Sequence, residues 1–170
     1  LTLRRLAAIE ALSRYGRATP QQLEPLVLDP AYWPTSALLD WIGILQRLQS
    51  VPKRDARRAE AYALLRGRLE LQGTALRFST ERGDALWWLM VSGDSNAART
   101  ILAVLDASGW REELPRLVLG ALGRLRRGHW DTTVANAWGA LAMARFSERF
   151  EGQPPDGSTA VVVGPEPRSI

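Results

Sequence analysis

The sequence predicts an all-α fold of seven to eight helices, followed by a short β-strand near the C-terminus. Leu and Ala, both strong helix formers, account for 26 and 23 of the 170 residues. Apolar residues recur at intervals of three or four along several segments, which is typical of helices that bury one face. After residue 151 the composition changes to Gly, Pro and Val, so we expect a helical domain over 1–151 and a linker with a strand over 152–170.

Four helices are expected in the first part of the chain, at 2–15, 20–28, 35–50 and 55–71. Thr19 before Pro20 combines a favoured N-cap with the residue preferred at the first helical position. Thr35 or Ser36 is expected to cap the third helix. The third helix also carries an apolar stripe at helical spacing, formed by Leu38, Trp41, Leu45 and Leu48.

An extended segment is expected at 74–79, and four further helices at 82–92, 95–107, 112–126 and 132–149. Pro115 is compatible with the helix 112–126 because it lies in the first turn. The last helix is apolar on more than one side, so we expect it to be buried on two faces. Residues 159–163 predict a β-strand because they are rich in Val and are bounded by Gly and Pro.

A tryptophan motif occurs twice with the same internal spacing. Residues 33–36 (WPTS) are followed by Trp41, and residues 130–133 (WDTT) are followed by Trp138. We expect the hydroxyl residues to cap a helix and the second tryptophan to face the core. A weaker third copy runs from Phe78 to Trp88, and the distances between copies suit helix-pair repeats. Along the sequence, two helices are predicted between the copy at 33 and the weaker copy at 78, and three between the copy at 78 and the copy at 130, so the repeat is irregular or one helix is wrongly assigned.

The composition excludes several kinds of site. The chain contains no Cys, which excludes disulfides, thiol nucleophiles, thiolate metal sites and thioesters within it. His129 is the single His, so no His-based metal site is expected, and we predict no cofactor. No apolar run is long enough to span a membrane. The chain starts at Leu1 without a leader-like segment, so either a leader is missing or this is a segment of a longer protein.

The net charge of +4 arises mainly from arginine and is concentrated in residues 53–58 and 124–127. A solvated helix face is the favoured interpretation of both clusters, because this excess is modest for a nucleic-acid binder. A basic helical-repeat module that binds phosphate groups remains an alternative. The tryptophans are interpreted as core residues, with a carbohydrate- or base-stacking platform as the alternative.

Acidic residues offer three weaker candidates for catalysis. His129 and Asp131 with a nearby Ser resemble part of a hydrolytic triad, but no Gly-x-Ser-x-Gly nucleophile turn is present. Glu112 and Glu113 are neighbours and therefore point about 100° apart on a helix. Asp40 and Asp84 lie on helices expected to face a common cavity, and a separation within about 10 Å would suit a carbohydrate-active enzyme with an α-helical toroid fold.

Residues 128–133 (GHWDTT) and 135–142 (ANAWGALA) together resemble a signature of large bacterial alpha-2-macroglobulin-like proteins. The signature lies near the end of the helical, thioester-type domain of that family. Residues 146–151 and 82–87 (RGDALW) extend the similarity, which covers most of 33–163. The residues of the structural motif are Trp33, Thr35, Trp41, Trp130, Thr132, Thr133, Asn136 and Trp138.

The resemblance implies an α/α toroid, of which this chain would be the C-terminal part, an incomplete ring, with a tail that leads into an adjoining β-rich domain. It implies a non-catalytic segment of a protease inhibitor that traps proteases in the periplasm or cell envelope of a bacterium. The expected partners are target proteases, bound through the full-length parent, and the neighbouring β-rich domains, with no nucleic acid. Membrane anchoring is expected only through other parts of the parent. Many members use a thioester formed by a Cys-x-Glu-Gln motif, which this chain lacks.

Overall fold

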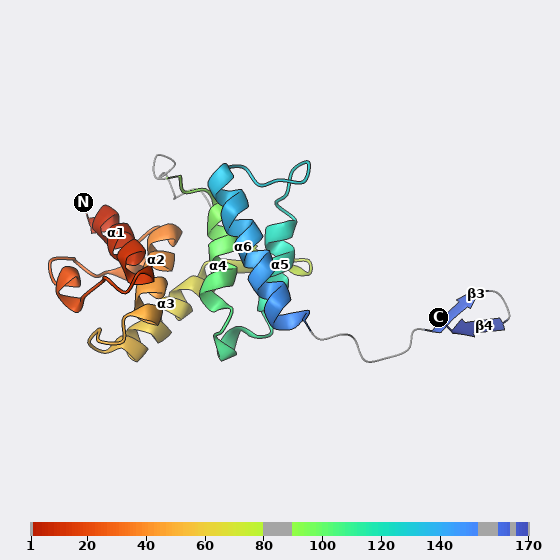
Figure 1. The fold of residues 1–170 in the computed structure, drawn as a ribbon, viewed down its shortest axis with the longest axis horizontal. Coiled ribbons are helices and arrows are strands. Elements are labelled where there is room, and N and C mark those ends of the chain that lie inside the picture. Colours follow the sequence, from red (N-terminus) through yellow and green to blue (C-terminus); the bar gives the residue numbers. More distant parts are fainter. Residues whose placement is uncertain (1, 80–89, 153–159, 164–165, 170) are drawn as a thin grey trace.

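The structure, a computed structural model, describes residues 2–79, 90–152, 160–163 and 166–169. Within these residues the fold is mainly α-helical, with two small antiparallel hairpins (Figure 1). The helices are α1 (Thr2–Arg14), α2 (Thr35–Arg47), α3 (Arg54–Gly67), α4 (Gly93–Val104), α5 (Leu114–Leu122) and α6 (Thr133–Phe150). The strands are β1 (Leu69–Gln72), β2 (Ala75–Phe78), β3 (Ala160–Val163) and β4 (Glu166–Ser169). Three short 3-10 turns lie at Pro20–Leu23, Pro30–Tyr32 and Ser108–Trp110.

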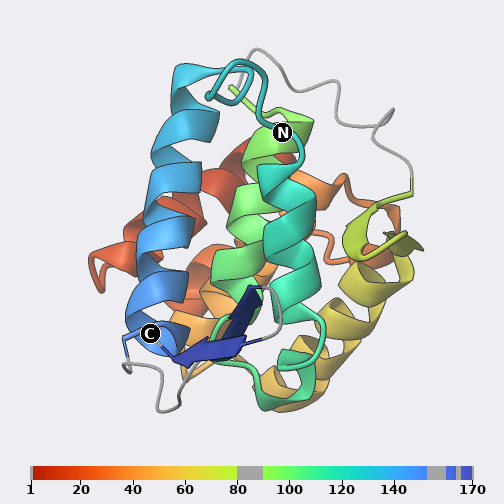
Figure 2. The ribbon, with the colours of Figure 1, turned by 90° about the vertical axis from the view of Figure 1, so that its right-hand side faces the viewer.

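The helices form two groups, and each group is built around one central helix. α1 and α3 pack against α2, whereas α5 and α6 pack against α4, and the contact between α2 and α4 joins the groups (Figures 1 and 2). All ten residues of 36–45 in α2 are buried. A helix with neighbours on nearly every side must be apolar nearly all round, which explains the uninterrupted burial of α2.

The hairpin of β1 and β2 connects the first group to the second. Leu69 lies opposite Phe78, and Gly73 adopts a positive φ of 63° in the turn between the strands. β2 packs against α5 so closely that a Cβ at Gly120 would lie 2.2 Å from the carbonyl oxygen of Leu76. Only glycine therefore fits at this position of α5.

Several predicted boundaries are wrong for local reasons. The helix expected at 20–28 is a single 3-10 turn, Pro20–Leu23, because Pro25 has no N–H to continue the ladder. The helix expected at 55–71 ends at Gly67, and its last residues form β1, which pairs with β2. α2 has Pro34 as its N-cap without a side-chain bond, so the expected cap by Thr35 or Ser36 is wrong.

The other elements of the helical part agree more closely with the sequence. Ser92 caps α4 through a bond from the Ser95 N–H, so the helix begins two residues earlier than expected. α5 is shorter than the expected 112–126 and ends before Gly123. The helix expected at 82–92 falls largely on residues 80–89, outside the described part of the chain, and 90–92 are not helical. Six α-helices are thus present among the described residues, and the closure of a toroid stays a prediction.

α6 is buried along one stripe. Its buried residues, Ala135, Gly139 and Ala142, lie along one face of the helix, whereas Leu141 is 43% exposed and Phe150 is 41% exposed. The expected burial on two faces is therefore wrong for the described chain. The expected strand at 159–163 is confirmed over Ala160–Val163 as β3, while Thr159 lies outside the described residues. β3 pairs antiparallel with β4, which the sequence did not predict.

Candidate functional site

The entry of α6 is held by the residues that carry the tryptophan motif. The Thr132 hydroxyl accepts a hydrogen bond from the Ala135 N–H at 3.0 Å and caps the helix. The Asn136 side chain accepts a bond from the Trp130 N–H at 3.0 Å and donates to the carbonyl oxygens of Trp130 at 3.0 Å and Thr132 at 2.7 Å. Asn136 therefore fastens the preceding loop onto the first turn of α6, while Thr133 is exposed.

Trp130 links this entry to the neighbouring helices. Its indole N–H donates to the carbonyl oxygen of Ala121 in α5 at 2.9 Å, and the residue is only 8% exposed. Its ring lies directly over Gly139, where an added Cβ would be 2.2 Å from a ring carbon. Glycine at 139 is thus required by the ring that covers it.

In the first copy of the motif, the corresponding residues make different contacts. Trp33 and Trp41 are both buried and pack edge to face, with ring centroids 6.3 Å apart. Arg68 donates to the Thr35 hydroxyl at 3.2 Å and to the Trp33 carbonyl oxygen at 2.8 Å. Trp138, the counterpart of Trp41, is instead half-buried. The two copies thus share a sequence pattern at a helix entry but not a set of contacts, and Trp87 and Trp88 of the third copy lie outside the described residues.

Asp94 joins three segments, and the sequence analysis did not identify it. Its carboxylate accepts bonds from the Arg124 side chain at 2.6 Å and from the Asp131 N–H at 2.9 Å. Ser92 donates to the Asp131 carboxylate at 2.9 Å. Arg124, one of the second basic cluster, therefore forms an internal ion pair between α4 and the end of α5.

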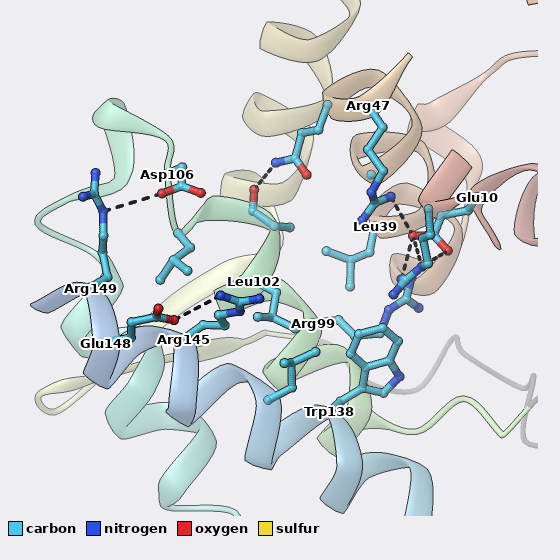
Figure 3. Close-up of a pocket in the computed structure, with 16 residues that line it drawn as sticks. Glu10, Leu39, Arg47, Arg99, Leu102, Asp106, Trp138, Arg145, Glu148 and Arg149 are labelled. Carbon is cyan, nitrogen blue, oxygen red and sulfur yellow. Dashed lines mark hydrogen bonds and ion pairs between the residues drawn. The ribbon is translucent and has the colours of Figure 1, made fainter. Parts of the chain in front are cut away.

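A second polar network lies where α1 and α2 face α4 and α6 (Figure 3). Glu10, itself buried, pairs with Arg14 at 2.7 Å and with Arg47 at 3.0 Å. Asp40 pairs with Arg99 at 2.5 Å across the contact between α2 and α4. Burial raises the pKa of the Asp40 carboxyl above its ordinary value, although the adjacent Arg99 opposes that shift.

Trp138 completes this network from α6. The guanidinium carbon of Arg14 lies 4.7 Å from the centroid of the Trp138 ring, and that of Arg99 lies 5.6 Å from it. These are distances at which cations interact with an aromatic face. Trp138 thus connects the ion pairs of both helix groups.

The network lines one end of a hollow of about 610 Å³ between the two groups. Arg149 of α6 and Asp106, which follows α4, stand at the opposite end of it in Figure 3. Gln46, Leu102 and Asp106 also line a second hollow of about 680 Å³ beside Tyr62 and Trp110. We call the two adjoining hollows, with the residues that line them, the interhelical groove.

The catalytic candidates are not assembled into a site. His129 Nδ1 contacts the Trp130 carbonyl oxygen, whereas Asp131 is bound by Ser92 and the Asp131 N–H by Asp94, so no His–Asp pair of a triad is formed. Glu113 binds Arg66 at 3.0 Å. Asp40 is paired with Arg99, and Asp84 lies outside the described residues.

The basic stretch 53–58 is partly neutralised. Asp55 pairs with Arg54 at 3.0 Å and with Arg58 at 3.3 Å, and Arg54 also donates to the Leu45 carbonyl oxygen. In the part of the chain that the structure describes, no group of three His, Asp or Glu side chains could hold a metal ion. No helix there is both long enough and apolar enough to cross a membrane.

Comparisons of the chain with protein-family models, curated proteins and solved structures found no match.

Proposed function

We propose that this chain is a non-catalytic segment of the helical domain of a bacterial alpha-2-macroglobulin-like protease inhibitor. The observation that supports this proposal is the set of contacts made by the residues that carry the resemblance. Trp130, Asn136 and Gly139 are bound together at the entry of α6, and each has a contact that another residue would not reproduce. The residue types at these positions of the signature therefore specify one packing arrangement at the entry of α6.

The end of the chain also supports the proposal. α6 is followed by the β3–β4 hairpin, which is the change of secondary structure expected where a helical domain is followed by a β-rich one. In the proposed parent, α2 and α4 would be inner helices of an α/α toroid, because each has neighbours on more than one side. The ring would be completed by other parts of the parent.

The proposed role is mechanical. A protease cuts a bait segment of the parent, the domains rearrange, and the protease is held in the envelope or periplasm. The ion pairs and capped helix entries of this segment would keep the helices together as one body during that movement. A thioester would require a cysteine elsewhere in the parent, since this chain contains none. Without one, retention of the protease would be non-covalent.

The experiment is a trapping assay on the full-length parent. The parent is incubated with several unrelated proteases, and residual activity is measured on a large protein substrate and on a small peptide substrate. The proposal predicts selective loss of activity on the large substrate, together with a mobility shift on a native gel. Equal activity on both substrates with no shift would contradict it.

The two alternative functions gain less support. A carbohydrate-active site would need an accessible Asp40, whereas this carboxylate is buried against Arg99. A nucleic-acid interface gains less support because three arginines of the two basic clusters, Arg54, Arg58 and Arg124, are paired with Asp55 and Asp94.

A further inference from the structure

The β3–β4 hairpin makes its extensive contacts only within itself, as far as the described elements are concerned. β3 and β4 pair antiparallel along their whole length, and neither strand packs extensively against a described helix. Figure 1 shows the hairpin standing clear of α1–α6. A two-stranded hairpin is only marginally stable in water, and a further strand or a packed helix is needed to hold it. The hairpin therefore requires a partner beyond the described elements of the chain.

The register of the hairpin decides which backbone groups face outward. In antiparallel pairing, hydrogen-bonded residue pairs alternate with pairs that are not hydrogen-bonded. Val162 lies opposite Pro167, which has no N–H to donate, so this pair is of the second kind. Val163 and Glu166, which are separated by two residues, are then the hydrogen-bonded pair that closes a two-residue hairpin.

The outward-facing backbone groups differ between the two strands. Residues of a non-hydrogen-bonded pair direct their N–H and C=O groups away from the partner strand. On β3 these residues are Ala160 and Val162, and each has both an N–H and a C=O. On β4 they are Pro167 and Ser169, and Pro167 has no N–H. β3 thus has a complete outer edge, whereas the outer edge of β4 is interrupted.

The sequences of the two strands agree with this difference. β3 reads Ala-Val-Val-Val, a continuous apolar run that is typical of a strand inside a sheet. β4 reads Glu-Pro-Arg-Ser, and charged residues and Pro are common on the edge strands of natural sheets. Register and composition both indicate that β3 is an inner strand, and β4 an edge strand, of a larger sheet.

We propose that the outer edge of β3 binds a third strand, supplied by the adjoining β-rich domain of the parent protein. The outward N–H and C=O groups of Ala160 and Val162 form hydrogen bonds with that strand, and β4 remains the edge of the enlarged sheet. The source of the third strand rests on the proposed function, whereas the choice of β3 rests on the hairpin alone.

A second copy of the chain is the competing source of a third strand. β3 carries no charged residue, so its pairing with β3 of another copy meets no charge repulsion. A strand in the same polypeptide, however, is present at an effective concentration on the order of millimolar. That concentration exceeds the micromolar concentration of separate copies in a dilute solution, so the strand of the parent pairs first.

Amide hydrogen exchange, resolved to single residues by mass spectrometry, tests this pairing in the full-length parent and in the 170-residue chain alone. An N–H that is bonded to a third strand exchanges only when the sheet opens. We expect the Ala160 and Val162 amides to exchange at least about 100-fold more slowly in the parent than in the chain alone. The Ser169 amide should exchange fast in both.

Two proline variants of the parent identify the paired edge. Val162→Pro removes an outward N–H of β3 but none of the bonds between β3 and β4, so the Ala160 amide should lose its protection. Ser169→Pro removes an outward N–H of β4 and should leave the protection of Ala160 and Val162 unchanged. The amide of Val161, which faces β4, should stay protected in both variants and shows that the hairpin itself is intact.

Fast exchange of the Ala160 and Val162 amides in the parent would overturn the proposal, because β3 would then be an edge strand. Protection of these amides in the chain alone that increases with its concentration would identify a second copy as the partner, and would also overturn it. Trapping is measured separately. A parent that traps no protease but protects both amides would contradict the proposed function and leave the strand pairing supported.

Discussion

Gly139→Ala should destabilise the protein, although the same change in an open helix would stabilise it. Ala is favoured over Gly in a helix interior by about 1 kcal/mol. At position 139 the added Cβ would lie 2.2 to 2.5 Å from three carbons of the Trp130 ring. The ring would have to move, and its movement would strain the indole bond to Ala121, which is 2.9 Å long.

The magnitude follows from these opposing effects. Overpacking costs about 1–3 kcal/mol, and leaving the buried indole N–H unbonded costs about 1–3 kcal/mol, against a helix gain of about 1 kcal/mol. We expect a net loss of roughly 1–5 kcal/mol in the free energy of unfolding, a range that reaches the upper end of the effects of single substitutions.

Urea denaturation followed by far-ultraviolet circular dichroism measures this loss. Trp130→Leu provides the matched background, because it removes the ring that an alanine at 139 would meet. In that background Gly139→Ala should be neutral or stabilising by up to about 1 kcal/mol. If Gly139→Ala stabilised the protein in both backgrounds, the ring would not restrict this position and the packing of the α6 entry would be wrong.

Three further predictions concern the polar networks. Asn136→Ala should lower the free energy of unfolding by about 1–3 kcal/mol, because the Trp130 N–H loses its partner and the carbonyl oxygens of Trp130 and Thr132 each lose one side-chain donor; unfolding in urea measures it, and an unchanged midpoint would contradict it. A double-mutant cycle with Asp94→Asn and Arg124→Gln should give a coupling energy of about 1–3 kcal/mol, whereas additive effects would show that the pair is not formed. Because the pKa of folded Asp40 is raised, the folded state binds its proton more tightly than the unfolded state does; stability should therefore fall as the pH rises from the ordinary aspartate pKa through the raised one. Asp40→Asn should remove this part of the pH dependence in urea titrations at several pH values, and an unchanged slope would refute it.

Features that depend on neighbouring residues were largely predictable. The main helices were expected from apolar spacing, and the capping of α6 by Thr132 was expected from the hydroxyl pair after Trp130. Both depend on residues within a turn or two of each other. The same reasoning failed for α2, where Pro34 takes the cap position that the hydroxyl residues were expected to hold.

Features that depend on distant residues were not predictable. β1 continues a helical pattern in sequence, and only its pairing with β2 makes it a strand. Asp94 and Arg124 are 30 residues apart, and Asp40 and Arg99 are 59 apart, so no local spacing identifies either pair. The interhelical groove likewise brings together residues from α1, α2, α3, α4 and α6, which meet only after the helices have packed.

Electron cryomicroscopy of the full-length parent would show whether these helices belong to a closed ring. We expect α1–α6 to continue into further helices that close a ring, with α2 and α4 on its inner side and the β3–β4 hairpin joined to a β-rich domain. A parent in which α1–α6 form a separate unit, with no ring around them and no adjoining β-rich domain, would contradict the account.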